Sequence, residues 1–167
     1  IFVIIYFFVL FLDGNPVVFK QKRIGKNNKI FYLYKFRSMK VYIGDIPTHL
    51  INNPSELLTF SGKLLRKFSL DELPQIINII KGDICFVGPR PALHNQQDLI
   101  KLRTENSVHK VMPGITGWAQ VNGRDLLSIE EKVKFDIYYC QNASLIFDIK
   151  IIFKTIFQLF IQKGINH

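Results

Sequence analysis

The chain has 167 residues, the size of one domain, and 22 Lys and Arg against 13 Asp and Glu give a formal net charge of +9. Apolar residues make up 48% and 15 residues are Phe, which excludes a disordered tail, and two Cys cannot build a disulfide scaffold. No apolar run reaches the roughly 20 residues of a spanning helix, so a multi-span membrane protein is excluded. The remaining class is a basic domain with an anionic partner, which is nucleic acid, an acidic membrane surface or a phosphorylated substrate.

The N-terminal segment, residues 1–12, is apolar and uncharged, and a turn follows at 13–16. As a helix it would be about 18 Å long, too short to cross a hydrocarbon core of about 30 Å. Eight cations and no acid lie between Gly14 and Gly44. Because Lys and Arg gather on the cytoplasmic face, this flank favours a membrane segment that enters and leaves there over a buried core element. The chain begins with Ile, so we expect the first half of such a segment upstream.

Two strands are predicted next, at 16–25 and 29–40, joined by a hairpin turn. In the second strand Lys35 and Arg37 share a face, where they either bind one anion or lie solvated. Loops with one short helix are expected over 41–62.

Helices dominate the rest of the chain. Capping boxes at Ser69–Glu72 and Ser128–Glu131 predict helices that run to about 81 and 139. The other expected elements are a strand at 84–87, a helix at 93–106, a turn at 113–117, a brief strand at 118–121 and a helix at 145–163. Since helices and short strands mix without a regular βαβ alternation, we predict an α+β fold rather than a doubly wound one.

The last of these helices, residues 145–163, has an apolar face at i, i+3, i+4 spacing and a polar face opposite it. A helix with two such distinct faces, with aromatic residues and with flanking Lys is suited to lie in a membrane interface. A terminal helix packed on the domain core explains the pattern equally well, so both interpretations stay open.

Asp71 and Glu72 are adjacent acids at a predicted helix start, where acids are also common for electrostatic reasons alone. The cations Arg66 and Lys67 lie just upstream. An Asp among cations stays ionised, and a neighbouring Glu can hold a divalent metal. Such a group supports phosphoryl transfer, in which Asp71 attacks phosphorus while a metal and Arg side chains take up the charge.

Two further Arg residues lie in constrained loops. Arg90 stands between Pro89 and Pro91, and because proline restricts its neighbours, we expect a stiff loop that presents Arg90 to a phosphate or to solvent. Arg124 follows a turn, and it either binds a phosphate or pairs with Asp125.

Taken together, the motifs resemble the bacterial sugar transferases, the monotopic phosphoglycosyl transferases that load a sugar phosphate onto polyprenyl phosphate. They occur in the family's order across nearly the whole chain. The matching stretches are Gly14–Phe19, Lys35–Met39, Leu65–Lys67, Ser69–Gln75, Val87–Pro91 and Pro113–Arg124.

The resemblance implies that Asp71 attacks the β-phosphate of a UDP-sugar, releases UMP and passes the sugar phosphate to undecaprenyl phosphate. It implies that Mg²⁺ is held by Glu72 with Asp71, and that phosphates are bound by Lys35, Arg66, Arg90 and Arg124. It further implies a re-entrant membrane helix at 1–12, a catalytic domain at 13–167 on the cytoplasmic face of the bacterial inner membrane, and lipid rather than nucleic acid as partner. Residues 53–59 depart from the family's usual basic run.

Two alternatives to an enzyme remain. One is a nucleic-acid-binding module, in which cationic strands interleave with Phe31, Tyr32, Tyr34 and Phe36. The other is a peripheral lipid-binding protein without catalysis, which leaves the Asp71–Glu72 pair without a role.

Overall fold

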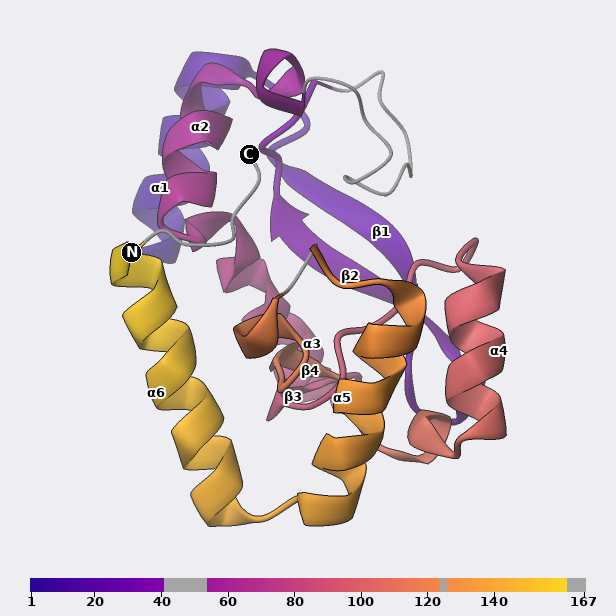
Figure 1. Ribbon diagram of the computed structural model, residues 1–167. Coiled ribbons are helices and arrows are strands. Elements are labelled where there is room, and N and C mark those ends of the chain that lie inside the picture. Colours follow the sequence, from indigo (N-terminus) through magenta and orange to yellow (C-terminus); the bar gives the residue numbers. More distant parts are fainter. Residues whose placement is uncertain (41–53, 124–125, 162–167) are drawn as a thin grey trace. The chain divides into compact units, whose positions relative to one another are not determined.

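The computed structural model describes residues 1–40, 54–123 and 126–161 (Figure 1). Over these residues it contains six α-helices and two two-stranded sheets, which confirms the α+β class. None of the described helices combines the length and the apolar character needed to cross a bilayer. The elements in chain order are α1 (Phe2–Asp13), β1 (Val18–Ile24), β2 (Ile30–Phe36), α2 (Phe60–Lys67), α3 (Ile76–Lys81), β3 (Cys85–Val87), α4 (Gln97–Glu105), β4 (Gly114–Thr116), α5 (Ile129–Asn142) and α6 (Leu145–Ile161).

The chain divides into two compact units, each with its own internal contacts. Unit 1 comprises Ile1–Gln21 and Tyr32–Asn78, and unit 2 comprises Lys22–Phe31 and Ile79–Asn166. The hairpin of β1 and β2 contributes residues to both, and its connection, Lys26–Asn28, forms a short 3₁₀ turn as expected.

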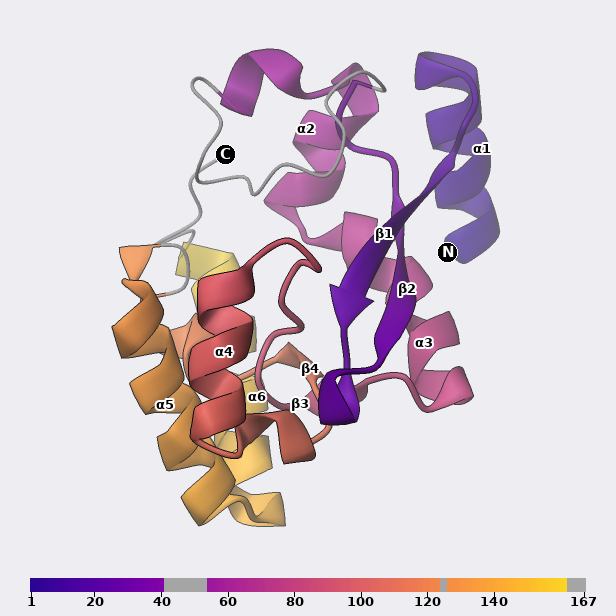
Figure 2. The same ribbon diagram turned by 90° about the vertical axis from the view of Figure 1, so that its right-hand side faces the viewer.

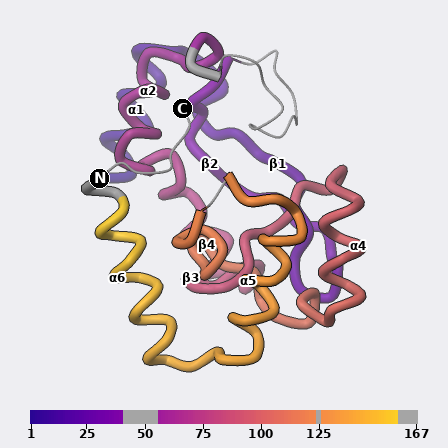
Figure 3. The backbone as a smooth tube through the Cα atoms, viewed as in Figure 1, coloured from indigo at the N-terminus to yellow at the C-terminus, as the bar shows by residue number. Residues whose placement is uncertain are grey.

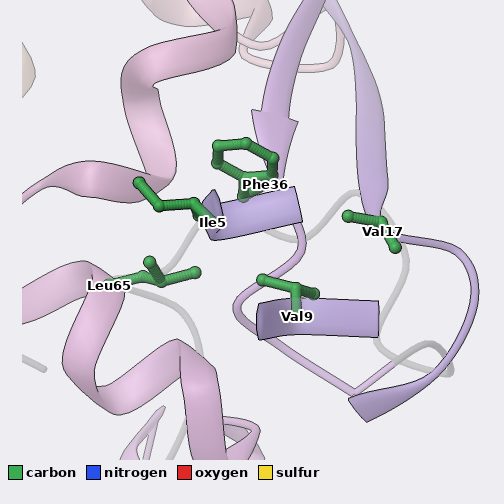
Figure 4. Packing of buried hydrophobic residues seen from close by; sticks show 5 residues of the cluster. All are labelled: Ile5, Val9, Val17, Phe36 and Leu65. Atoms are coloured by element: carbon green, nitrogen blue, oxygen red, sulfur yellow. The ribbon is translucent and has the colours of Figure 1, made fainter. Parts of the chain in front are cut away.

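Unit 1 is built where α1 packs along α2 (Figure 1). Its core consists of buried side chains from both helices and from the hairpin (Figure 4). These are Ile5, Val9, Val17, Phe36 and Leu65, all at most 7% exposed. Full burial of one such side chain contributes about 1.5–3 kcal/mol, so α1 is an integral part of this core.

Polar contacts fix the end of α1. The helix ends at Gly14, whose φ of +72° favours glycine. The last helical residue, Asp13, accepts a hydrogen bond at Oδ2 from the hydroxyl of Ser61, a fully buried residue of α2. Helix α1 is thereby anchored to α2 by both apolar packing and a polar contact.

The centre of unit 2 is the parallel pair of β3 and β4, with Cys85 opposite Gly114 and Val87 opposite Thr116. Two glycines allow the segments to approach closely. A Cβ added at Gly88 would lie 2.4 Å from the Met112 carbonyl oxygen, and one at Gly114 would lie 2.1 Å from the Gly88 nitrogen. Gly88 and Gly114 therefore allow the two backbone segments to pack closely.

Helices α4 and α5 lie side by side in unit 2 (Figure 2). The buried cluster beside them includes Ala92, Leu99 and Val133. Helix α5 starts at the predicted capping box, in which Ser128 and Glu131 exchange both hydrogen bonds.

A short connection leads from α5 into α6, as the backbone trace shows (Figure 3). The side of α6 that packs on the rest of unit 2 combines the buried Ile151 and the partly buried Phe147 with polar contacts. The polar contacts are Asp148 with the Tyr139 hydroxyl at 2.9 Å, Thr155 with the Thr116 hydroxyl at 2.6 Å, and Gln158 with the Val121 carbonyl at 2.9 Å. The outward side is exposed and apolar, and it carries Leu145, Ile146, Ile149, Ile152, Phe153, Ile156 and Phe157.

Some local predictions were wrong. Ser69 does not cap a helix, because it adopts a left-handed conformation with φ of 52° and a 3₁₀ segment, Leu70–Gln75, follows it before α3. The strand expected at 118–121 is a 3₁₀ turn, Gln120–Asn122, while β4 forms within the predicted turn at 113–117. Helix α4 starts four residues later than expected, and α2 was not predicted. Residues 41–53, a predicted loop region, lie outside the described residues.

Candidate active site

Asp71 and Glu72 lie on the 3₁₀ segment Leu70–Gln75 of unit 1, between α2 and α3. The two acids are neighbours on this segment and differ in exposure. Asp71 is buried at 6% exposure, and the Glu72 side chain is 14% exposed.

Lys35 of β2 reaches the same place. Its Nζ lies 2.8 Å from Glu72 Oε1, and the Lys35 side chain is 16% exposed. The structure therefore brings together a predicted phosphate ligand and a predicted metal ligand from segments 37 residues apart.

The position of this segment is set from both sides. Arg66, in the last turn of α2, donates from Nε to the Ser38 hydroxyl at 3.0 Å. Asn78 of α3, which is fully buried, accepts from the Tyr34 amide at 3.0 Å and donates to the Tyr32 carbonyl at 2.7 Å. Both helices that flank the acids are thus hydrogen-bonded to β2 or to the residues just after it.

Arg37 has a different environment from Lys35. It is 6% exposed, and its Nη atoms donate to the carbonyls of Asp13, Gly14 and Asn15, the last two at 2.8 and 2.9 Å. A cation at a helix C-terminus is favourable because the free carbonyls carry partial negative charge. In unit 1, Lys35 and Arg37 therefore do not converge on one anion site.

The Arg90 loop belongs to unit 2, and Pro89 and Pro91 on either side of Arg90 are both buried. The Arg90 carbonyl accepts from Arg103 Nη1 at 2.7 Å, and the Pro91 carbonyl accepts from Arg23 Nη1 at 2.9 Å. Arg124 lies outside the described residues.

Sequence reasoning missed an ion pair in unit 2. Arg103 of α4 donates from Nε and Nη2 to Asp136 Oδ2 of α5, at 2.9 and 2.7 Å, and the side chains are 11% and 2% exposed. Burial raises the pKa of the Asp136 carboxyl, and the Arg103 charge opposes this shift. Residues 33 positions apart leave no pairing signal in a single sequence.

A second missed contact joins Tyr139 of α5 to Asp148 of α6. The Tyr139 hydroxyl donates to Asp148 Oδ1 at 2.9 Å and lies 3.1 Å from the Val87 carbonyl. Burial, together with this hydrogen bond, raises the pKa of Tyr139. Burial and then the Asp148 charge raise the pKa of the Cys85 thiol. Both groups are therefore protonated at neutral pH.

The donors at the acid pair fit a hard cation. No group of three or more His, Cys, Asp and Glu suited to a metal occurs among the described residues. Mg²⁺ needs no such cage, since it binds through one or two carboxylates together with substrate phosphates and water. Asp71 and Glu72 supply that number of carboxylates.

The family model of the bacterial sugar transferases matches residues 1–162. The chain belongs to the bacterial sugar transferase family. This confirms the resemblance drawn from the motifs, and it covers both units of the structure.

Named relatives of this sugar transferase agree with that assignment. The chain is 46% identical over 156 residues to an uncharacterized sugar transferase of Bacillus subtilis, EpsL, covering 92% of this chain and 74% of the relative. It is 43% identical over 157 residues to the UDP-glucose:undecaprenyl-phosphate glucose-1-phosphate transferase of Escherichia coli, covering 90% and 34%. It is 40% identical over 147 residues to the UDP-N-acetylgalactosamine-undecaprenyl-phosphate N-acetylgalactosaminephosphotransferase of Aeromonas hydrophila, covering 85% and 35%. The chain thus spans only about a third of the latter two.

Proposed function

We propose that this sugar transferase moves a sugar-1-phosphate from a UDP-sugar to undecaprenyl phosphate and releases UMP, a first membrane step in glycoconjugate assembly. The observation that carries the proposal is the acid pair, in which Asp71 is buried and Glu72 is held by Lys35. The names of the Escherichia coli and Aeromonas relatives support the same reaction class. Family membership favours this enzyme over a nucleic-acid-binding or non-catalytic lipid-binding protein.

The reaction proceeds in two displacements at phosphorus. An oxygen of the Asp71 carboxylate attacks the β-phosphorus of the donor, the bond to the bridging oxygen breaks, and UMP leaves with that oxygen. The sugar phosphate is then bonded to Asp71 as an acyl phosphate. An oxygen of undecaprenyl phosphate attacks the same phosphorus in the second step, which releases the lipid diphosphate sugar and restores the carboxylate.

Metal binding and phosphate binding belong to charged groups of the chain. Glu72, with Asp71, would hold Mg²⁺, which when bound supplies positive charge beside the donor phosphates. Lys35, Arg66, Arg90 and Arg124 bind phosphate oxygens, with the forked guanidinium groups suited to bidentate contacts. For Arg37 we propose a structural role in place of phosphate binding, because its Nη atoms hold the three carbonyls that end α1.

The exposed apolar surface of the protein supports a proposal for where the enzyme acts. We propose that the enzyme acts at the cytoplasmic face of the bacterial inner membrane, where its acceptor lies. Support comes from the outward side of α6, on which Phe153 is 69% and Phe157 is 65% exposed. Such a face needs an apolar environment, and the basic chain suits an acidic lipid surface. Helix α1 serves as the inserted segment.

The test is UMP release with undecaprenyl phosphate and Mg²⁺, using UDP-glucose, UDP-galactose and UDP-N-acetylgalactosamine in turn. Asp71→Asn keeps the size of the side chain but removes the nucleophile, so we expect release to fall at least about a thousandfold, to background. Asp98→Asn, an exposed acid in the first turn of α4, is the matched control and should keep full activity. Full turnover by Asp71→Asn would refute the nucleophile, and no release from any donor by the unaltered chain would refute the function.

A further inference from the structure

The backbone of the Arg90 loop is held at four consecutive carbonyls, those of residues 89–92, and every contact lies within unit 2. The donors, in order, are Gly114 N at 3.0 Å, Arg103 Nη1 at 2.7 Å, Arg23 Nη1 at 2.9 Å and Ile24 N at 2.9 Å. Two of the four donors are guanidinium groups, which form stronger hydrogen bonds than neutral donors do.

Close packing alone does not fix this loop. A cavity of about 30 Å³ lies against it, lined among others by Pro89, Pro91, Arg103 and His109. This is enough space for a water molecule beside the loop. The hydrogen bonds from the two arginines therefore add to the packing of the buried residues Pro89 and Pro91 in fixing the backbone.

Arg103 is itself fixed by Asp136. Its guanidinium uses Nε and Nη2 for the Asp136 carboxylate and Nη1 for the Arg90 carbonyl. The Asp136 side chain is only 2% exposed, and Arg103 is its one ion-pair partner among the described residues. One planar group thus connects α4, α5 and the loop, and its fork geometry sets their spacing.

We propose that Arg103 and Asp136 are positioning residues for the transfer reaction, because they hold the Arg90 loop so that the Arg90 guanidinium meets a donor phosphate in one orientation. The inference rests on the proposed function, in which Arg90 binds phosphate. Neither residue touches substrate. Their effect on the rate arises because a phosphate ligand displaced by about 1 Å can cost on the order of a hundredfold in rate.

The first test measures, without turnover, how firmly Arg103 and Asp136 hold the Arg90 loop. We call this pair of residues the clamp. Amide hydrogen exchange is followed in the peptide over residues 86–93 of the full chain in detergent micelles. Arg103→Lys keeps a cation beside Asp136 but cannot span both partners, so we expect exchange in this peptide to become at least about tenfold faster. Lys101→Gln, an exposed cation on the same helix, is the matched control and should leave exchange unchanged.

The second test measures the role in catalysis by a double-mutant cycle. Arg103→Lys alone should lower kcat/KM for the active UDP-sugar by about 10- to 100-fold. In an Arg90→Lys background, where the forked phosphate contact is already lost, the same change should cost less than about threefold. Asp136→Asn leaves Arg103 buried without its counter-ion and can fail to fold, so Arg103→Lys decides the question.

The possible results distinguish a failure of the positioning role from a failure of the proposed function. Unchanged exchange in Arg103→Lys would overturn the clamp. An equal loss of kcat/KM in both backgrounds, matched by a lower unfolding temperature, would overturn the positioning role and leave a purely structural one. If the unaltered chain released no UMP, the proposed function would fail and the positioning role with it, while exchange would still decide whether the pair holds the loop.

Discussion

At the scale of single residues, the two acids on one short segment differ in their burial and in their contacts. Asp71 is buried, whereas Glu72 is bound at Oε1 by Lys35. Exclusion of water suits the nucleophile role that we propose for Asp71, and a carboxylate oxygen suits the metal-ligand role that we propose for Glu72. Both acids lie on a 3₁₀ segment and not in the predicted capped helix.

Lys35 is expected to compete with Mg²⁺ for Glu72, since both would bind the same carboxylate. We predict that Lys35→Met lowers the Mg²⁺ concentration for half-maximal UMP release by up to about fivefold, because a partly exposed ion pair contributes roughly 0.2–1 kcal/mol. Maximal turnover should fall at the same time, since a phosphate ligand is lost.

A readout independent of turnover is the rise in unfolding temperature with added Mg²⁺, which should begin at a lower concentration in Lys35→Met. Lys63→Met removes an exposed cation from α2 in the same unit and is the control. An unchanged Mg²⁺ dependence in both measurements would show that Lys35 and the metal do not share Glu72.

At the scale of elements, α1 is an apolar helix that packs on α2, the helix next to the segment that bears Asp71. Val9 of α1 and Leu65 of α2 are buried in the same cluster, and Leu65 directly precedes Arg66 (Figure 4). Helix α2 in turn contacts the segment that bears Asp71. The position of Asp71, the proposed nucleophile, therefore depends on the packing of α1.

Leu65→Ala should reveal this dependence. We predict a loss of about 2–5 kcal/mol in the free energy of unfolding, measured by denaturant in detergent micelles, because the change opens a cavity in the core of unit 1. Leu64→Ala, whose side chain is 47% exposed, should change stability by no more than about 0.5 kcal/mol. Equal losses in the two variants would contradict the core assignment.

Elements with local signals were predictable from the sequence. The helix at 128–139 was found because its capping box needs only residues three apart, and Ser128 and Glu131 form it. The same pattern failed at Ser69, which adopts a left-handed conformation and whose side chain forms no cap hydrogen bond. Strand β4 was hidden, because its glycines are typical of turns and its pairing with β3 depends on a segment 29 residues away.

The candidate site was predictable in its residues but not in its contacts. Adjacent acids among cations led to the prediction of phosphoryl transfer at Asp71 and Glu72, and the structure adds the pairing of Glu72 with Lys35. Two nearby cations on one strand looked equivalent, yet Arg37 holds the end of α1 instead. Which partner a charged side chain finds depends on tertiary packing, and a single sequence does not contain that information.

At the scale of the whole molecule, the net charge of +9 and the exposed apolar side of α6 are interpreted together. The apolar side of this helix points outward because its other side is held in unit 2 by the buried Ile151 and by three polar contacts. Two Lys residues of the helix, Lys150 and Lys154, lie over the Trp118 ring at 5.9 and 4.5 Å from its centroid. Burial of the apolar side therefore requires a partner outside the described residues, and a lipid surface suits a cationic protein.

The double variant Phe153→Ser, Phe157→Ser tests that partner. We predict that it weakens binding to anionic phospholipid vesicles by roughly tenfold for each side chain, because burying half of a Phe contributes on the order of 1.5 kcal/mol. Co-sedimentation measures the binding, and Leu126→Ser, which alters a residue 70% exposed outside α6, is the control. Unchanged vesicle binding with a loss of self-association would assign the face to a second copy of the chain instead. Circular dichroism should show the same helix content in all three proteins, since neither Phe contributes to the core of unit 2.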